Sequence, residues 1–139
     1  MDRHERLLAF LEETIAYFLS KLERVDRDRY FADRDIRNIL DKTINDIILC
    51  VIDVAEECLK AKERNIPDTY KDTILACHEL LGDITLKVAP LVKRRNEAIH
   101  HYLKANWQNI VAVKTRIPEV KEFADKARIL LTPSQENRS

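Results

Sequence analysis

The stretch IRNILDKTINDIILCVIDVAEEC, residues 36–58, decides the fold class of this chain. Its apolar residues recur at steps of three and four, which is the spacing of one face of an α-helix. Ile48 and Ile52 widen that face, so we expect this helix to contact neighbours on two sides. In a domain of this size, such a surplus of apolar surface suggests a partner subunit. The face itself comprises Ile36, Leu40, Ile44, Ile47, Val51, Val54 and Cys58.

The same spacing marks the other helices. Residues 3–24, 84–103 and 107–131 each carry an apolar face, and a shorter helix is expected from about residue 68 to 81. Residues 26–35, DRDRYFADRD, break the pattern and are expected to form a connection. We therefore predict an all-α fold, an antiparallel bundle of four main helices plus a short one. The short helix should turn Tyr70, Ile74, Cys77 and Leu81 inward.

Several residues are expected to set the helix ends. Asp33 is a suitable N-cap for the long second helix, and Asp83 can cap the segment that follows the short helix. Gly82 suits a left-handed conformation just past the end of the short helix. Pro90 must start a new helical segment or kink an existing one, whereas Pro118 interrupts the hydrogen bonding of the last helix but not its apolar face.

Length and composition indicate one soluble domain. The chain has 139 residues, and we expect residues 1–131 to form a single domain and residues 132–139 a disordered tail. One glycine and four prolines disfavour an all-β fold, which needs many turns. Lys and Arg number 24, as do Asp and Glu, so no global field draws the chain to nucleic acid. Any affinity for RNA must come from a local patch.

The sequence favours a cytoplasmic protein that does not enter a membrane. It has no run of eighteen apolar residues, and its N-terminus lacks the apolar region of a signal peptide. Cys50, Cys58 and Cys77 form no CxxC pair and lie in apolar helical contexts. We expect them to be buried and reduced.

The segment KRRNEAIHHYLK, residues 93–104, gathers cations and two histidines in a chain of zero net charge. At about 100° per residue, Arg95 falls at the centre of an apolar stripe, where a cation is costly unless it is paired or functional. His100 lies roughly 140° further round, on a polar side. A second subunit could bring the two sides into one cleft. The stripe comprises Val88, Leu91, Val92, Ile99 and Tyr102.

Three interpretations of this segment compete. It could be a solvated basic face, with an arginine reaching outward from the edge of the core. It could bind metal, because Glu97 and His100 form the E-x-x-H step of di-iron bundles, although such a site needs two of these steps. It could also handle a phosphate without metal. RNA cleavage by its own 2′-hydroxyl needs a group that moves protons near neutral pH, such as histidine, and a fixed cation, such as arginine.

The segment resembles a known motif. Residues 95–102, RNEAIHHY, resemble the R-N-x-x-x-H-x-Y signature of HEPN-domain proteins of the HepT type, the toxins of MntA–HepT toxin–antitoxin pairs. Residues 66–70, IPDTY, resemble the family's P-x-x-Y opening of the middle helix, and Trp107 is an aromatic that opens the last helix. His101 stands where an acidic residue is common in the family, and Pro90 is unusual just before the motif. The resemblance extends from about residue 3 to 131.

The resemblance implies a HEPN-like homodimer with both copies of the motif in one cleft. It implies metal-independent endoribonuclease activity that uses no cofactor, with Arg95 and His100 as the catalytic pair and Asn96 in support. Lys93, Arg94 and His101 are further candidates for binding the RNA substrate. The implied partner is an MntA-type nucleotidyltransferase antitoxin, which silences the toxin by adding AMP to the motif tyrosine, here Tyr102.

Two other functions stay open at this point. The chain could be a noncatalytic subunit that docks a nucleotidyltransferase and holds nucleotide or RNA in the same cleft. It could also be an interaction bundle without a ligand. Measurable RNA turnover would distinguish a ribonuclease from the noncatalytic subunit. Loss of RNA affinity in the Arg95→Ala variant would argue against an interaction bundle without a ligand.

Overall fold

The computed structural model describes residues 2–100 and 106–133, without the side chains of residues 98–100. Predictions about the His100 side chain, His101, Tyr102 and the tail from residue 134 therefore lie outside the described residues. The described segments are helices and short connections, with no strand among them, so the predicted all-α class is confirmed. The helices are α1 Arg3–Leu22, α2 Arg27–Ala32, α3 Arg34–Ala61, α4 Tyr70–Leu75, α5 His78–Leu81, α6 Ile84–Val88, α7 Leu91–His100 and α8 Trp107–Leu131.

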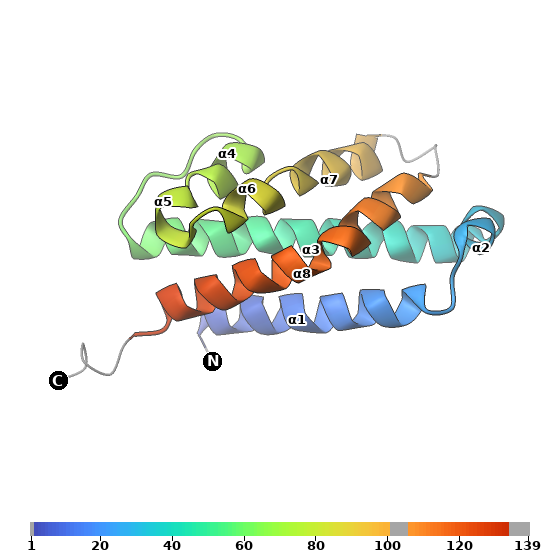
Figure 1. Ribbon diagram of the computed structural model, residues 1–139, viewed down its shortest axis with the longest axis horizontal. Helices are drawn as coiled ribbons and strands as arrows, with labels where there is room; N and C mark the ends of the chain where they lie inside the picture. Colours follow the sequence, from blue (N-terminus) through green and yellow to red (C-terminus); the bar gives the residue numbers. More distant parts are fainter. Residues whose placement is uncertain (1, 101–105, 134–139) are drawn as a thin grey trace.

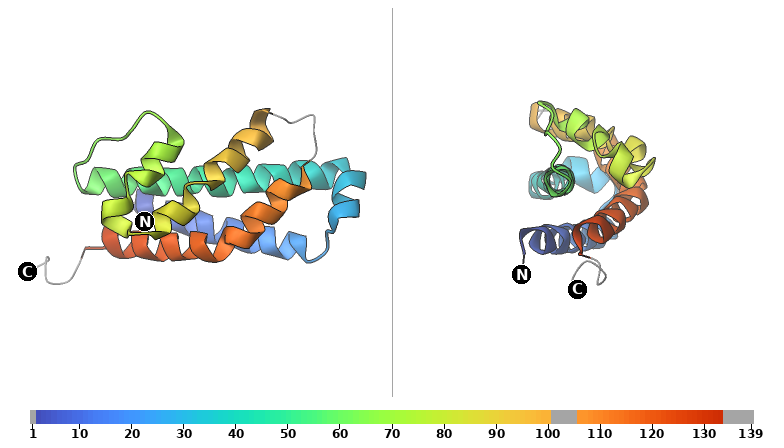
Figure 2. Two further views of the ribbon diagram at one scale, coloured as in Figure 1. Left: turned by 45° about the horizontal axis from the view of Figure 1, so that its top comes forward. Right: turned by 90° about the vertical axis from the view of Figure 1, so that its left-hand side faces the viewer.

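Helix α3 lies at the centre of the arrangement. It contacts α1, α8 and α7, and it also contacts α4 and α2, which lie toward its two ends in Figure 1. Figure 1 shows α1 running opposite to α3, and α8 running opposite to α1, with the short helices α4 to α7 on the other side of α3. In the left view of Figure 2, α6 lies beside α8, and α7 rises away from α8 toward the end at which α2 lies.

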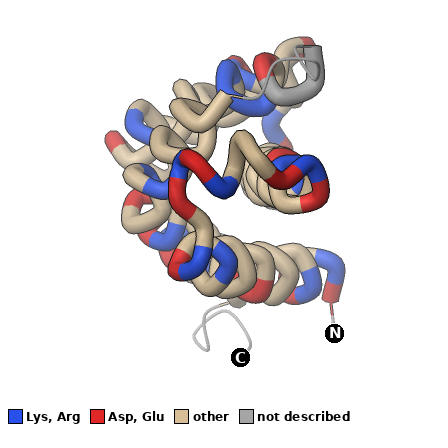
Figure 3. Tube along the Cα trace, turned by 90° about the vertical axis from the view of Figure 1, so that its right-hand side faces the viewer, with Lys and Arg blue, Asp and Glu red and all other residues tan. Residues whose placement is uncertain are grey.

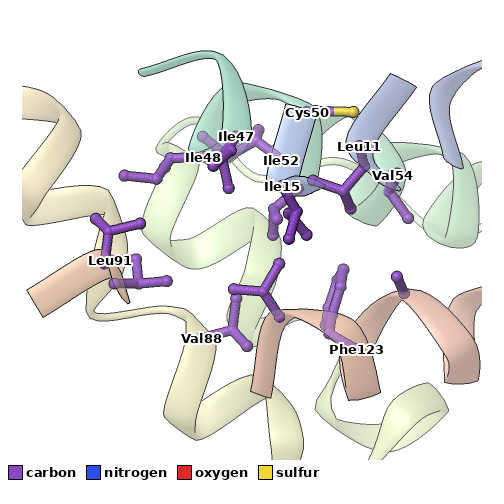
Figure 4. Close-up of a cluster of buried hydrophobic side chains, with 14 of the residues drawn as sticks. Leu11, Ile15, Ile47, Ile48, Cys50, Ile52, Val54, Val88, Leu91 and Phe123 are labelled. Atoms are coloured by element: carbon purple, nitrogen blue, oxygen red, sulfur yellow. The ribbon is translucent and has the colours of Figure 1, made fainter. Parts of the chain in front are cut away.

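One apolar core joins these helices. Side chains from α1, α3, α6, α7 and α8 meet in it, and Figure 4 shows a part of this cluster. Ile48 and Ile52 are 1% and 0% exposed, so α3 does contact neighbours on two sides, as predicted. Both neighbours belong to the same chain, however, and the width of this face therefore gives no argument for a partner subunit.

The connection predicted for residues 26–35 contains a helix. Asp26 accepts a hydrogen bond from the Arg29 amide and starts α2, which turns the side chain of Tyr30 into the core. The predicted N-cap of α3 is confirmed, because the Asp33 carboxylate accepts from the amides of Asp35 and Ile36.

Helix α3 ends at Ala61, a few residues before the predicted end near residues 65–67. Glu63 has a φ of 55°, in the left-handed region, and its amide bonds to the carbonyl of Lys60. The amide of Arg64 bonds to the carbonyl of Leu59 at 2.9 Å. These two bonds form a Schellman motif, built here around a glutamate instead of a glycine.

The expected single helix over residues 68–81 is divided into α4 and α5. Thr69 caps α4 by accepting from the amide of Asp72. Gly82 has the positive φ that its position requires, but its ψ of −161° lies outside the left-handed helical region, in a conformation that essentially only glycine adopts. The prediction that Asp83 caps the next helix was wrong, because its carboxylate lies 2.9 Å from the His78 ring instead.

Pro90 divides the segment from residue 84 to 103, as predicted, into α6 and α7. Pro118 lies inside α8 without ending it, and α8 keeps the predicted bounds of residues 107–131. Among the described helices, none combines the length and the apolar character needed to cross a bilayer.

Candidate functional site

Arg95 leaves α7 toward the start of α4. Its guanidinium carbon lies 5.0 Å from the centre of the Tyr70 ring. Its Nη1 atom donates a long hydrogen bond of 3.4 Å to the Asn96 side chain. Its Nε atom is buried and has no acceptor in the described part of the chain. The prediction that Tyr70 points inward was wrong: the residue is 42% exposed and lies against Arg95.

These contacts orient the Arg95 guanidinium without neutralising it. Over the described residues, no carboxylate lies within 4.0 Å of it. An aromatic face attracts a cation but takes up none of its N–H donors. Arginine presents several donors in a planar fork that matches the oxygens of a phosphate. The arrangement therefore leaves a half-buried cation with donors available to an anion.

Arg94 points to another side of α7, toward α8. Its Nη1 atom donates to Oδ1 of Asn109 at 3.3 Å, and Asn109 is 3% exposed. Glu97 lies 3.8 Å from Arg94 and 3.9 Å from Lys93, so both pairs are longer than hydrogen bonds. Consecutive residues on a helix differ by about 100°, and this difference directs Arg94 and Arg95 to different neighbouring helices.

Asn96 is an exposed residue whose side chain accepts from Arg95. The structure thus brings together Arg95, Asn96 and Tyr70. The other member of the predicted catalytic pair, the His100 side chain, lies outside the described residues, as do His101 and Tyr102. Sequence analysis did not single out Asn109, although an asparagine beside the apolar face of residues 107–131 is a signal of a buried polar contact.

Tyr30 anchors the start of α8, at Asn106 and Trp107. The Tyr30 hydroxyl donates to Asp41 at 2.8 Å and accepts from the Asn106 amide at 3.2 Å. The Tyr30 ring centre lies 5.3 Å from that of Trp107. Asn106 also caps α8 by accepting from the amide of Gln108. Tyr30 and the Asn106 cap therefore fix the start of α8.

Burial dominates the electrostatics of this anchor. It raises the pKa of Tyr30 well above its ordinary range, and the hydrogen bond to Asp41 adds to the effect. Burial also raises the pKa of Asp41, while the Tyr30 hydroxyl and Arg37 act in the opposite direction. Sequence analysis missed this anchor because Tyr30 lies in a charged stretch that was expected to be a connection.

The structure places one group of potential metal ligands at the start of α1. The donor atoms of Asp2, His4 and Glu5 lie within 4.8 Å of one another among the described residues. Asp2 and Glu5 are exposed, and exposed acids gather in this way without metal. The group belongs to a different element from Arg95, and the arrangement gives no reason to route phosphate chemistry through it.

A model of the family described as Ribonuclease HepT-like matches residues 11–127. The chain belongs to the HepT-like ribonuclease family. The matched region includes α2 to α7 and most of α1 and α8, and so contains Tyr70, Arg95 and Asn109. No curated protein matches the chain significantly. No solved structure does so either.

Proposed function

We propose that this protein is a metal-independent endoribonuclease, the toxin of a HepT–MntA-type toxin–antitoxin pair in the cytoplasm. The observation that carries the proposal is the Arg95 guanidinium, which is held by Tyr70 and meets no carboxylate among the described residues, in a chain of the HepT-like ribonuclease family. A cation of this kind suits the charge that builds on phosphorus during RNA cleavage.

The proposed reaction needs no external nucleophile. The 2′-oxygen of the RNA forms a bond to phosphorus, and the bond from phosphorus to the 5′-oxygen of the next nucleotide breaks. One base takes the proton from the 2′-hydroxyl, and one acid gives a proton to the departing 5′-oxygen. We assign these proton transfers to His100 and the stabilisation of the phosphorane oxygens to Arg95. The products are a 2′,3′-cyclic phosphate and a 5′-hydroxyl.

The need for both a base and an acid favours a dimer. Each chain offers one motif His100, so two copies of the motif in one cleft would supply both groups. We propose a HEPN-like bundle in which α6 and α7 together take the place of the fourth main helix, and a homodimer of such bundles. Sedimentation at micromolar concentration tests this directly, and a monomeric mass would contradict the composite site.

We propose that an MntA-type nucleotidyltransferase controls this activity through Tyr102. Transfer of AMP from ATP joins phosphorus to the tyrosine oxygen and releases pyrophosphate. The new phosphate ester carries negative charge and acceptor oxygens, which would compete with the RNA phosphate for the motif arginine. Modification of Tyr102 should therefore silence cleavage without unfolding the protein.

The first experiment is cleavage of total cellular RNA by the purified protein in excess EDTA. We expect the wild-type protein to cleave, and Arg95→Ala and His100→Ala to lose most of that activity. Lys126→Ala on α8 is the control, because it removes one exposed cation away from α7. Intact mass must first show that Tyr102 carries no AMP.

The results distinguish a ribonuclease from a noncatalytic subunit and a metal-independent mechanism from a metal-dependent one. Cleavage that survives EDTA and is lost in both motif variants supports the ribonuclease. Cleavage that EDTA abolishes contradicts a metal-independent mechanism. If unmodified wild-type protein cleaves nothing, the proposal fails, and the noncatalytic subunit that binds nucleotide or RNA beside a nucleotidyltransferase takes its place.

A further inference from the structure

A groove of about 490 Å³ lies between α8 and the pair α6 and α7. Four cations line it, Lys87, Lys93, Arg94 and Arg116, and none of its described lining residues is acidic. Pro90, Leu91 and Ala112 are among its apolar lining residues. By contrast, Figure 3 shows Lys and Arg interspersed with Asp and Glu along much of the described chain. The groove is therefore a local concentration of positive charge.

Helical geometry explains why these cations converge. Leu91 and Arg94 are three residues apart on α7, so they share one side of that helix, and Lys87 of α6 lines the same groove. Both helices contact α8, which supplies Arg116. The hydrogen bond from Arg94 to Asn109 holds the Arg94 side chain on this side. Arg95 leaves the same helix toward Tyr70, so the groove is distinct from the Arg95 site but adjacent to it.

Nearby acids offset only part of this charge. Arg116 pairs with Glu119 at 2.9 Å, while Lys93 and Arg94 lie 3.9 and 3.8 Å from Glu97. Lys87 has no ion pair with any described residue. The Glu119 amide lowers the pKa of its own carboxyl, burial raises it, and Arg116 and Lys87 lower it, so that the pKa lies below its ordinary value. Four cations thus face two carboxylates, and the exposed Lys87 forms no ion pair within the described residues.

We propose that this groove binds the sugar–phosphate backbone of the RNA strand beyond the phosphate held at Arg95. The inference rests on the proposed ribonuclease function. Long basic side chains on three helices can follow consecutive phosphates, whereas a single free phosphate would need one compact cradle. The described lining residues include no aromatic side chain on which a base could stack. Binding at the groove is therefore strongly salt-dependent and nearly independent of base sequence.

The test measures binding to a strand that the enzyme cannot cut. A fluorescein-labelled, 2′-O-methylated oligouridylate has no 2′-hydroxyl to attack phosphorus, so its anisotropy reports binding alone. We expect Lys87→Glu to weaken binding roughly 3- to 10-fold. We expect the slope of log affinity against log salt to fall by about 0.7 for each phosphate that the variant no longer neutralises.

Lys126→Glu is the matched control. It makes the same change of charge on α8, about 15 Å along the helix from Arg116, and should leave affinity close to that of the wild type. Arg116→Glu is the second groove variant, checked by its unfolding transition because it also breaks the pair with Glu119. On a cleavable strand, Lys87→Glu should raise KM and leave kcat nearly unchanged.

The outcomes separate the groove from the catalytic proposal. Equal weakening by Lys87→Glu and Lys126→Glu would show a general charge effect and overturn the groove. The proposal that the groove binds RNA would also be overturned if Lys87→Glu and folded Arg116→Glu both bound the strand as tightly as the wild type. His100→Ala should bind the 2′-O-methyl strand like the wild type. A protein that binds through Lys87 but never cleaves would refute the ribonuclease and retain the groove.

Discussion

The guanidinium of Arg95 lies against the ring of Tyr70, with 5.0 Å between the arginine carbon and the ring centre. These two residues come from the two separate stretches that resemble the HepT-type family, residues 66–70 and residues 95–102. Tyr70 is the first residue of α4, directly after the cap formed by Thr69. The turn that starts α4 therefore sets the direction in which the Arg95 cation points.

Loss of the Tyr70 ring should reduce RNA cleavage. A cation–π contact at a partly exposed site is worth about 0.5–1 kcal/mol, which corresponds to about a 2- to 5-fold fall in kcat/KM for Tyr70→Ala. Tyr70→Phe keeps the ring and should cleave like the wild type. Cleavage of a fluorogenic RNA oligonucleotide measures both variants. Equal loss in Tyr70→Phe would assign the effect to the hydroxyl and contradict this role for the ring.

The Arg94–Asn109 hydrogen bond should show measurable coupling between α7 and α8. In a double-mutant cycle of Arg94→Ala and Asn109→Ala, we expect a coupling free energy of about 0.5–1.5 kcal/mol in urea unfolding. The pair of Arg94 and Glu97 is the comparison, because it is 3.8 Å long and partly solvated. Its coupling should be no more than about 0.5 kcal/mol. The opposite order of the two couplings would contradict the assigned contacts.

The Tyr30 hydroxyl should stabilise the fold. Tyr30→Phe leaves the half-buried Asp41 carboxylate and the Asn106 amide without their partner, so unfolding free energy should fall by about 1–3 kcal/mol at neutral pH. Tyr17→Phe removes a hydroxyl from an exposed tyrosine of α1 and should change stability by less than about 0.5 kcal/mol. A similar loss of unfolding free energy in the two variants would contradict a specific stabilising role of the Tyr30 hydroxyl.

The decrease in unfolding free energy caused by Tyr30→Phe should also depend on pH. The pKa of Asp41 is raised above its ordinary 3.8 in the folded protein, so folding favours its protonated form. Stability from this carboxyl is therefore greatest below the unfolded pKa and is lost as pH rises through the folded pKa. Removing the hydroxyl raises the pKa of Asp41 further, so the stability lost on raising the pH should be larger in the variant. Urea unfolding from about pH 4 to 7 measures it, and parallel curves would contradict the coupling.

The three cysteines should resist alkylation in the folded protein. Burial raises the pKa of Cys50 and of Cys58 to about 12 and that of Cys77 to about 11, so few thiolates exist at pH 8. Iodoacetamide should therefore modify them slowly in buffer and rapidly in denaturant, as read by intact mass. Ser20→Cys adds a thiol on the exposed side of α1 and should react before unfolding. Rapid native labelling of the three natural cysteines would show that the core opens locally.

Glycine at position 63 should stabilise the end of α3. Glu63 adopts a left-handed conformation that costs a residue with a Cβ atom about 1 kcal/mol. Glu63→Gly should raise the unfolding free energy by up to about 1 kcal/mol, after the greater freedom of glycine in the unfolded chain is subtracted. Lys62→Gly, one residue earlier and at negative φ, should instead destabilise. Thermal unfolding of the two variants distinguishes these signs.

Patterns local to the sequence predicted most of the fold. The long apolar faces of α1, α3 and α8 follow from helical periodicity, and the Asp33 cap follows from residue type. Local patterns gave wrong predictions where a side chain contacts a residue outside its own helix. Asp83 pairs with His78 instead of capping α6, and Tyr70 lies on Arg95 instead of turning inward. Tyr30 makes α2 part of the core although its neighbours in sequence are charged.

The sequence by itself determined the helical class, the position of Arg95 and Asn96 in a helix and the presence of a cation next to apolar residues of that helix. The spacing of residues along a helix is enough for each of these conclusions. Only the tertiary structure decided what each cation meets. It sends Arg95 to Tyr70 and Arg94 to Asn109, and it gathers Lys87 and Arg116 from two helices into one groove. Such contacts depend on which helices pack together, and packing is decided by the whole core.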